Sequence, residues 1–91
     1  MAQRLAAVVH GAVQGVGFRY YCALQARALG LQGYVHNRAD RRVEVVAEGP
    51  RAQLEQLLSW LYEGPSMAQV SSVEVSWLAA NGEFDCFEVR H

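Results

Sequence analysis

The 91-residue sequence contains no lysine and almost no excess of charge of either sign. All eight of its basic residues are arginines, against nine acidic residues, for a formal net charge of −1 at pH 7. Without a broad positive field the chain is poorly suited to bind nucleic acid or an anionic membrane, and we expect neither as a partner. Because every basic side chain is arginine, an arginine at a given position gains meaning only from its context.

The sequence also lacks any long hydrophobic run. No apolar segment approaches the ~20 residues that span a bilayer. The opening stretch MAQRLAAVV has too short an apolar segment for a signal peptide and runs directly into a strand-like pattern. We therefore expect a cytoplasmic protein.

Cysteine is scarce and widely spaced. Cys22 and Cys86 are the only two cysteines, and neither CxxC spacing nor clustered histidine suggests a zinc site. We expect both thiols to be buried and free of a disulfide, and we expect no metal and no cofactor.

The composition is that of a folded domain. Apolar residues make up 52% of the chain and charged residues 19%, which is typical of a chain that folds around a core. The length favours one domain over residues 1–91. We find no internal repeat and no interdomain linker.

Hydrophobic periodicity predicts strands over residues 4–10, 33–37, 43–48, 70–78 and 84–90, with helices over 20–29 and from Pro50 to Gly64. In the first helix the spacing of Tyr21, Leu24 and Ala28 predicts the buried face. A turn at residues 81–82 could join the last two strands as a hairpin. The pattern indicates an α+β fold: a ferredoxin-like βαββαβ sandwich with a mostly antiparallel sheet of four to five strands and two helices on one face.

The most informative segment is VQGVGFR, residues 13–19. Two glycines between a strand and a helix predict a tight turn whose backbone N–H groups converge on one point. The helix N-terminus adds attraction for an anion, and the guanidinium of Arg19 can bind two oxygens of it. The loop lacks the third glycine of a dinucleotide fingerprint, and no GK[ST] sequence of a P-loop occurs. These features alone leave open a turn without a ligand.

Residues 11–49, GAVQGVGFRYYCALQARALGLQGYVHNRADRRVEVVAEG, resemble the acylphosphatase family, whose members carry VQGVGFR, a helix ending LGLxGxVxN and a segment VEVxxEG. The likeness continues through GPSMAQV, near the family's GPxxAxV, and so covers nearly the whole chain. Tyr34 stands where the family commonly has tryptophan. Arg41 follows Asp40 where the family often has glycine, which leaves the type of this turn open.

The resemblance implies an enzyme that hydrolyses small acyl phosphates to a carboxylate and inorganic phosphate. By position it assigns Arg19 to phosphate binding and catalysis, Asn37 to orienting the attacking water, and a phosphate cradle to the backbone N–H groups of Gln14, Gly15, Val16, Gly17, Phe18 and Arg19. The leaving carboxylate, with a pKa of roughly 4 to 5, departs without a proton, so the reaction requires neither a general acid nor a metal. No base is evident, and our hypothesis is that a substrate phosphate oxygen takes the water's proton.

Other polar residues compete poorly for these roles. We expect His10 to be partly exposed and His36 to face away from Asn37, and we assign no role to the terminal His91. Asp40, Glu44 and Glu48 are expected to be solvated, with Glu44 near an arginine.

Two other functions remain open on the same architecture. One is a non-catalytic anion-binding or regulatory module, since the fold alone does not determine function. The other is an RNA-binding domain, which the charge balance and the lack of an aromatic strand pattern disfavour. We expect a monomer in either case.

Overall fold

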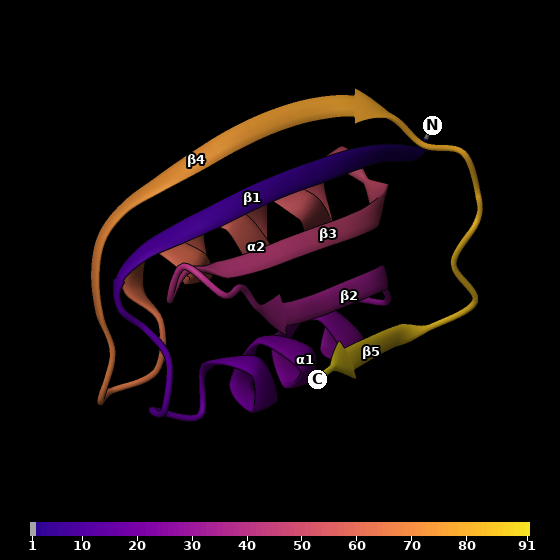
Figure 1. Ribbon diagram of the computed structural model, residues 1–91. Helices are drawn as coiled ribbons and strands as arrows, with labels where there is room; N and C mark the ends of the chain where they lie inside the picture. The colour runs from indigo at the N-terminus through magenta and orange to yellow at the C-terminus, as the bar shows by residue number, and fades with distance from the viewer. Residues whose placement is uncertain (1) are drawn as a thin grey trace.

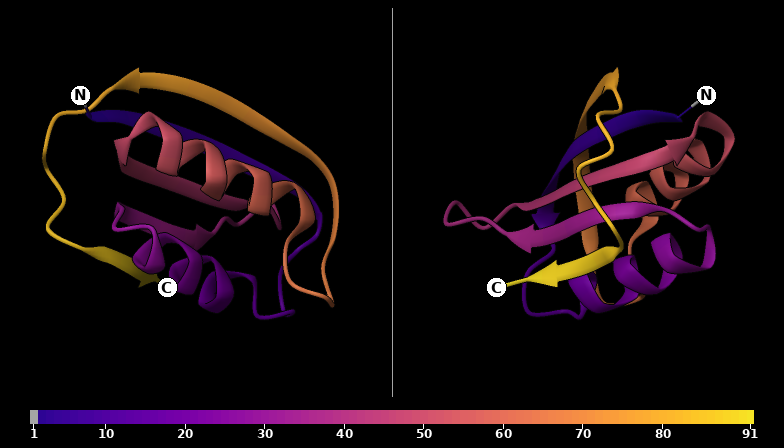
Figure 2. Two further views of the ribbon diagram at one scale, coloured as in Figure 1. Left: turned by 180° about the vertical axis from the view of Figure 1, so that it is seen from behind. Right: turned by 90° about the vertical axis from the view of Figure 1, so that its right-hand side faces the viewer.

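Residues 2–91 are described by the computed structural model, in the order β1 (Ala2–Ala12), α1 (Phe18–Ala28), β2 (Gln32–Asn37), β3 (Val43–Pro50), α2 (Arg51–Glu63), β4 (Gln69–Ala79) and β5 (Phe87–Arg90). The strands form one sheet in the order β4-β1-β3-β2-β5, and both helices cover the same face of it (Figures 1 and 2). The predicted ferredoxin-like α+β sandwich is confirmed. Within residues 2–91, no helix is long and apolar enough to cross a membrane.

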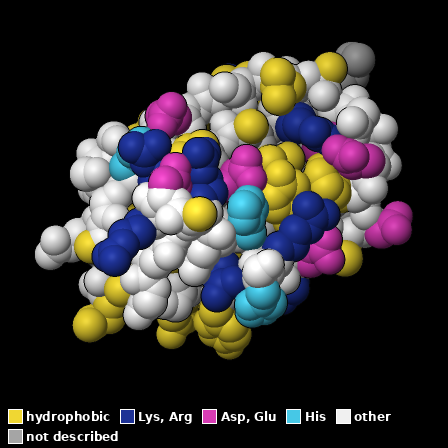
Figure 3. All heavy atoms as spheres, viewed as in Figure 1, with side chains coloured by type: hydrophobic (Ala, Val, Ile, Leu, Met, Phe, Trp, Pro, Cys, Tyr) yellow, Lys and Arg dark blue, Asp and Glu magenta, His cyan; other side chains and the backbone are white. Residues whose placement is uncertain are grey.

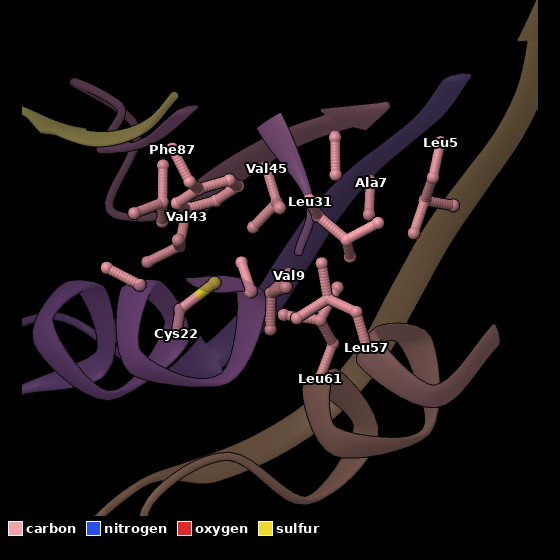
Figure 4. Packing of buried hydrophobic residues seen from close by; sticks show 14 of the residues in the cluster. Leu5, Ala7, Val9, Cys22, Leu31, Val43, Val45, Leu57, Leu61 and Phe87 are labelled. Atoms are coloured by element: carbon pink, nitrogen blue, oxygen red, sulfur yellow. The ribbon is translucent and has the colours of Figure 1, made fainter. Parts of the chain in front are cut away.

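The core lies between the sheet and the two helices. Alternation along β1 points Leu5, Ala7 and Val9 toward the helices, where the leucine stripe of α2 meets them (Figure 4). This stripe consists of Leu54, Leu57, Leu58 and Leu61, whose spacing of i, i+3, i+4 and i+7 predicts one apolar face. Leu54, Leu57 and Leu61 are fully buried, and Leu58 packs against the core partly buried. Each buried leucine contributes about 1.5–3 kcal/mol, so this contact fixes α2 on the sheet.

The buried face of α1 differs from the predicted one. The helix buries Phe18, Cys22, Ala23 and Ala26, whereas Tyr21 and Leu24 are 47% and 43% exposed. Small side chains allow the helix to lie close to the sheet, and the larger ones flank the contact. Arg27 donates from Nε to the carbonyl oxygen of Phe87 at 3.0 Å and so attaches α1 to β5.

The predicted C-terminal hairpin is wrong. β5 begins only at Phe87 and pairs with β2 in parallel, at the edge of the sheet opposite β4. Residues 80–86 therefore run from one edge of the sheet to the other past the strand ends (Figure 1). Cys86, expected to be buried, is exposed in this connection, while Cys22 is buried and both thiols are free.

Glu48 anchors this connection and is only 4% exposed, contrary to the expectation that it is solvated. Its carboxylate accepts from Arg4 Nε at 2.7 Å and from the backbone N–H groups of Asn81 and Gly82, both at 3.1 Å. Burial by itself would raise the pKa of the Glu48 carboxyl, but the N–H of Asn81, the Arg4 guanidinium and the N–H of Gly82 together hold that pKa below its usual value.

The turn between β2 and β3 has Arg41 where the family often has glycine, and its conformation could not be predicted from the sequence. Arg41 itself adopts a left-handed conformation with φ of 68°, the only non-glycine residue in the described chain with positive φ. Asp40 is held between its neighbours, because Arg38 and Arg42 both form ion pairs with its carboxylate. The turn therefore forms without glycine, at the cost of backbone strain.

The helix-free face of the sheet carries arginine, acidic and histidine side chains (Figure 3). Glu44 lies 2.5 Å from His36 Nε2 and accepts from the Tyr34 hydroxyl, so the expected arginine partner is wrong. His10, at 21% side-chain exposure, pairs with Glu74 of β4. His10 and His36 are therefore each paired with a glutamate of a neighbouring strand.

Replacing Glu48 by glutamine tests its role as an anchor. Because the folded-state pKa of Glu48 is depressed, its stabilising effect is complete above the unfolded-state value of about 4.3 and is lost as the pH falls through the folded-state pKa. We expect Glu48→Gln to lower the free energy of unfolding by about 1–3 kcal/mol near neutral pH and by less in acid. Urea denaturation at both pH values measures this, with the exposed Glu63→Gln at the end of α2 as control. Equal losses at both pH values would contradict it.

Replacing Arg41 by glycine should stabilise the protein. Glycine removes the left-handed strain of about 1–2 kcal/mol but makes the unfolded chain more flexible, so we expect a net gain of about 0.5–1 kcal/mol. Arg41→Ala removes the same charge without relieving the strain and serves as the control. Thermal unfolding of both variants measures the difference, and an equal effect of alanine and glycine would show that φ is not the cause.

Candidate active site

The directions of three strands define the site. β1 and β2 both run antiparallel to β3, and β5 runs parallel to β2. The carboxyl ends of β1, β2 and β5 therefore lie at the same end of the sheet. A pocket of about 360 Å³ opens there, lined by Val13, Gly15, Gly17, Phe18, Arg19, Tyr20, Asn37, Val89 and His91. The topology thus brings together the β1–α1 loop, the end of β2 and the residue after β5.

The loop before α1 has the conformation of an anion-binding nest. Gly15 and Gly17 have φ of 76° and 78°, and Gly17 caps α1 without any side-chain hydrogen bond. A Cβ at Gly15 would meet nothing within 4 Å, so its backbone conformation rather than space requires glycine. No hydrogen bond found within residues 2–91 uses the N–H groups of residues 14–17. These donors, with the positive end of α1 behind them, suit the oxygens of an anion.

Arg19 lies in the first turn of α1, and none of the ion pairs within residues 2–91 includes it. Its Nη1 donates to the carbonyl oxygen of Arg90 at 2.9 Å and to Nδ1 of His91 at 3.1 Å. A guanidinium has five N–H donors, two of them on Nη1, so Nε and Nη2 are left to bind two oxygens of one anion. The C-terminal strand therefore orients the guanidinium without neutralising its charge.

Asn37 is the last residue of β2 and lines the same pocket. It lies on the helix-facing side of the strand with Val35, and His36 lies on the opposite side, as alternation predicts. Its Oδ1 is buried, and within residues 2–91 it has no hydrogen-bond partner. An unpaired buried acceptor costs about 1–3 kcal/mol, so a donor that entered the pocket would gain a hydrogen bond at this oxygen.

The predicted site residues are not all pocket residues. Gly15, Gly17, Phe18, Arg19 and Asn37 line the pocket, whereas Gln14 and Val16 do not. Val16 packs against the core, and the side chain of Gln14 reaches the β2–β3 turn.

Sequence reasoning missed four residues at the pocket: Val13, Tyr20, Val89 and His91. Val13 lies in the VQGVGFR segment but was given no role. Tyr20, 61% exposed, follows Arg19 in the first turn of α1, and this adjacency could have indicated it. Val89 and His91 depend on the parallel pairing of β5 with β2, which has no local signature in the sequence. In the part of the chain that the structure describes, no three His, Cys, Asp or Glu side chains are grouped so as to hold a metal ion.

Comparisons with known proteins agree with the geometry. The family model "Acylphosphatase" matches residues 5–89. An acylphosphatase from Anaeromyxobacter sp. (strain Fw109-5) is 50% identical over 84 residues, covering 92% of this chain and 90% of that protein. One from Cupriavidus metallidurans is 57% identical over 79 residues, covering 87% and 82%.

A solved structure extends the likeness to three dimensions. The crystal structure of acylphosphatase from Bacillus subtilis superposes with a TM-score of 0.93 at 34% identity and covers the whole of both chains. The alignment at 50% identity, the match to the family model and the structural superposition each cover most of the chain. The chain belongs to the acylphosphatase family, and it is a hydrolase of acyl phosphates.

Proposed function

We propose that the pocket at the carboxyl ends of β1, β2 and β5 hydrolyses the carboxyl-phosphate bond by in-line attack of water. The observation that carries this proposal is the set of unpaired polar groups on its walls. Donors of the β1–α1 loop, two nitrogens of Arg19 and the carboxamide of Asn37 share one pocket without being satisfied by each other. An anion and a water molecule together would satisfy them.

The phosphoryl group binds in the cradle formed by the backbone N–H groups of Gln14, Gly15, Val16, Gly17, Phe18 and Arg19. These donors and the Nε and Nη2 groups of Arg19 contact its oxygens, where negative charge is carried through the transition state. Arg19 needs no large movement for this role, because the carbonyl of Arg90 already holds Nη1 at 2.9 Å. Fixed donors of this kind do not have to reorganise as the reaction proceeds.

Asn37 orients the attacking water. A carboxamide can accept a hydrogen bond from water through its oxygen and donate one to a phosphate oxygen through its nitrogen, which places the water relative to phosphorus. The new bond forms between the water oxygen and phosphorus, and the bond between phosphorus and the acyl oxygen breaks. The carboxylate leaves with the bonding electrons, and a proton of the water passes to a phosphate oxygen, giving inorganic phosphate.

The same proposal covers partners and location. All residues assigned to the reaction lie in one chain, which supports a monomer acting on a small acyl phosphate. The near-neutral charge of the chain supports a function without nucleic acid, and the two free thiols fit a cytoplasmic protein.

Removing the guanidinium tests the cradle. We expect the protein to hydrolyse benzoyl phosphate at an unchanged rate in EDTA, and Arg19→Ala to lower kcat/KM by about 10²–10³-fold or more, the cost of a lost donor to transition-state charge. Arg51→Ala at the start of α2 removes the same charge away from the pocket and should keep full activity. Absorbance of benzoyl phosphate follows the reaction. Full activity of Arg19→Ala, or its loss in EDTA, would refute the proposal.

Removing the carboxamide tests the division of roles. We expect Asn37→Ala to lower kcat by about 10²-fold because the water loses its orientation, while inorganic phosphate still inhibits with a nearly unchanged inhibition constant. Asn81→Ala, at the other asparagine of the chain, is the matched control and should retain kcat. If phosphate inhibition disappeared together with activity in Asn37→Ala, Asn37 would belong to the cradle instead.

A further inference from the structure

The side chain of Gln14 links the β1–α1 loop to the turn between β2 and β3. Its Nε2 lies 2.9 Å from the carbonyl oxygen of Arg38 and 3.0 Å from that of Arg42. These two carbonyls stand at the neck of the turn, which a backbone hydrogen bond of 2.8 Å from Arg38 N to Arg42 O closes. The carboxamide therefore contacts the backbone of both residues that close the turn.

The carboxamide of Gln14 matches the chemistry of this contact. Two carbonyl oxygens accept hydrogen bonds, and the NH₂ of a carboxamide supplies two donors without a charge. Both carbonyls also have a backbone donor, Arg41 N at 3.2 Å for Arg38 and Arg38 N at 2.8 Å for Arg42. Loss of Gln14 would therefore leave neither carbonyl unpaired, and the contact contributes more to geometry than to stability.

The contact joins two parts of the site that the sheet keeps apart. β1, which leads into the cradle, and β2, which ends at Asn37, are not neighbours, because β3 lies between them. Gln14 is the first residue of the cradle, and Arg38 directly follows Asn37. The carboxamide thus provides a direct link across β3 between the cradle and the strand end that carries Asn37.

We propose that Gln14 is a positioning residue whose carboxamide sets the distance between the phosphate cradle and Asn37. The inference rests on the proposed roles of the cradle and Asn37. In-line attack needs the water oxygen, phosphorus and the leaving oxygen in one line, and a displacement of about 1 Å can cost 10²-fold in rate. A phosphate held by the cradle alone has no such requirement, so Gln14 affects turnover more than phosphate binding.

Replacing Gln14 by leucine removes both donors at similar size. We expect kcat on benzoyl phosphate to fall about 10- to 100-fold, while the inhibition constant of inorganic phosphate changes less than about threefold. Gln32→Leu is the matched control, because its Nε2 bonds the carbonyl of Gly30 in another part of the chain, and it should retain kcat. An unchanged kcat in Gln14→Leu, or a loss of phosphate inhibition equal to the loss of kcat, would overturn the proposal.

A double variant separates positioning from a general structural effect. If Gln14 acts through Asn37, then Gln14→Leu should lower the residual rate of Asn37→Ala by less than about twofold. An equal loss in both backgrounds would show that Gln14 acts independently of Asn37 and would overturn the proposal. Should Gln14→Leu not fold, Gln14→Asn keeps the carboxamide but shortens its reach, and the same results are expected. A normal kcat in Asn37→Ala alone would instead refute the proposed role of Asn37.

Discussion

The site depends on the common direction of β1, β2 and β5. Had β5 paired with β4 as a hairpin, Arg90 and His91 would lie at the opposite edge of the sheet, and Arg19 would lose the acceptors that orient Nη1. Parallel pairing requires a connection that crosses the ends of the strands, and residues 80–86 provide it. The short final strand is thus part of the active-site architecture as well as an edge of the sheet.

Local patterns in the sequence predicted the parts of the site that are local in the fold. The glycines of the β1–α1 loop permit the positive φ that the turn adopts, and alternation along β2 separates Asn37 from His36. The buried residues of α2 are leucines at helical spacing, so the pattern alone identifies the face that packs against the sheet. In each of these cases the determining interaction lies within a few residues of the pattern.

The other predictions were wrong, or residues were missed, because the contacts that decide them join parts of the chain that are distant in sequence. After Phe18, the buried face of α1 consists of the small residues Cys22, Ala23 and Ala26, so the spacing of the large residues Tyr21 and Leu24 does not mark it. Glu48 appeared to be a solvated acid because its partners, Arg4, Asn81 and Gly82, are distant in sequence. His91 gains its contact with Arg19 only after β5 has found β2. The residues that form these contacts are more than 30 positions apart in the sequence, so no local pattern reveals them.

The buried Glu48 and the half-buried Arg19 are connected through residues 80–86. Glu48 holds the backbone of Asn81 and Gly82, the segment continues to Cys86, whose carbonyl accepts from Gly33 N at 2.9 Å, and β5 then presents the Arg90 carbonyl to Arg19. The buried carboxylate of Glu48 is satisfied by three donors, and the guanidinium of Arg19 is oriented by two neutral acceptors, the Arg90 carbonyl and His91 Nδ1. Charge is therefore neutralised at Glu48, where the connection is anchored, and left unneutralised at Arg19, where we propose that the anion binds.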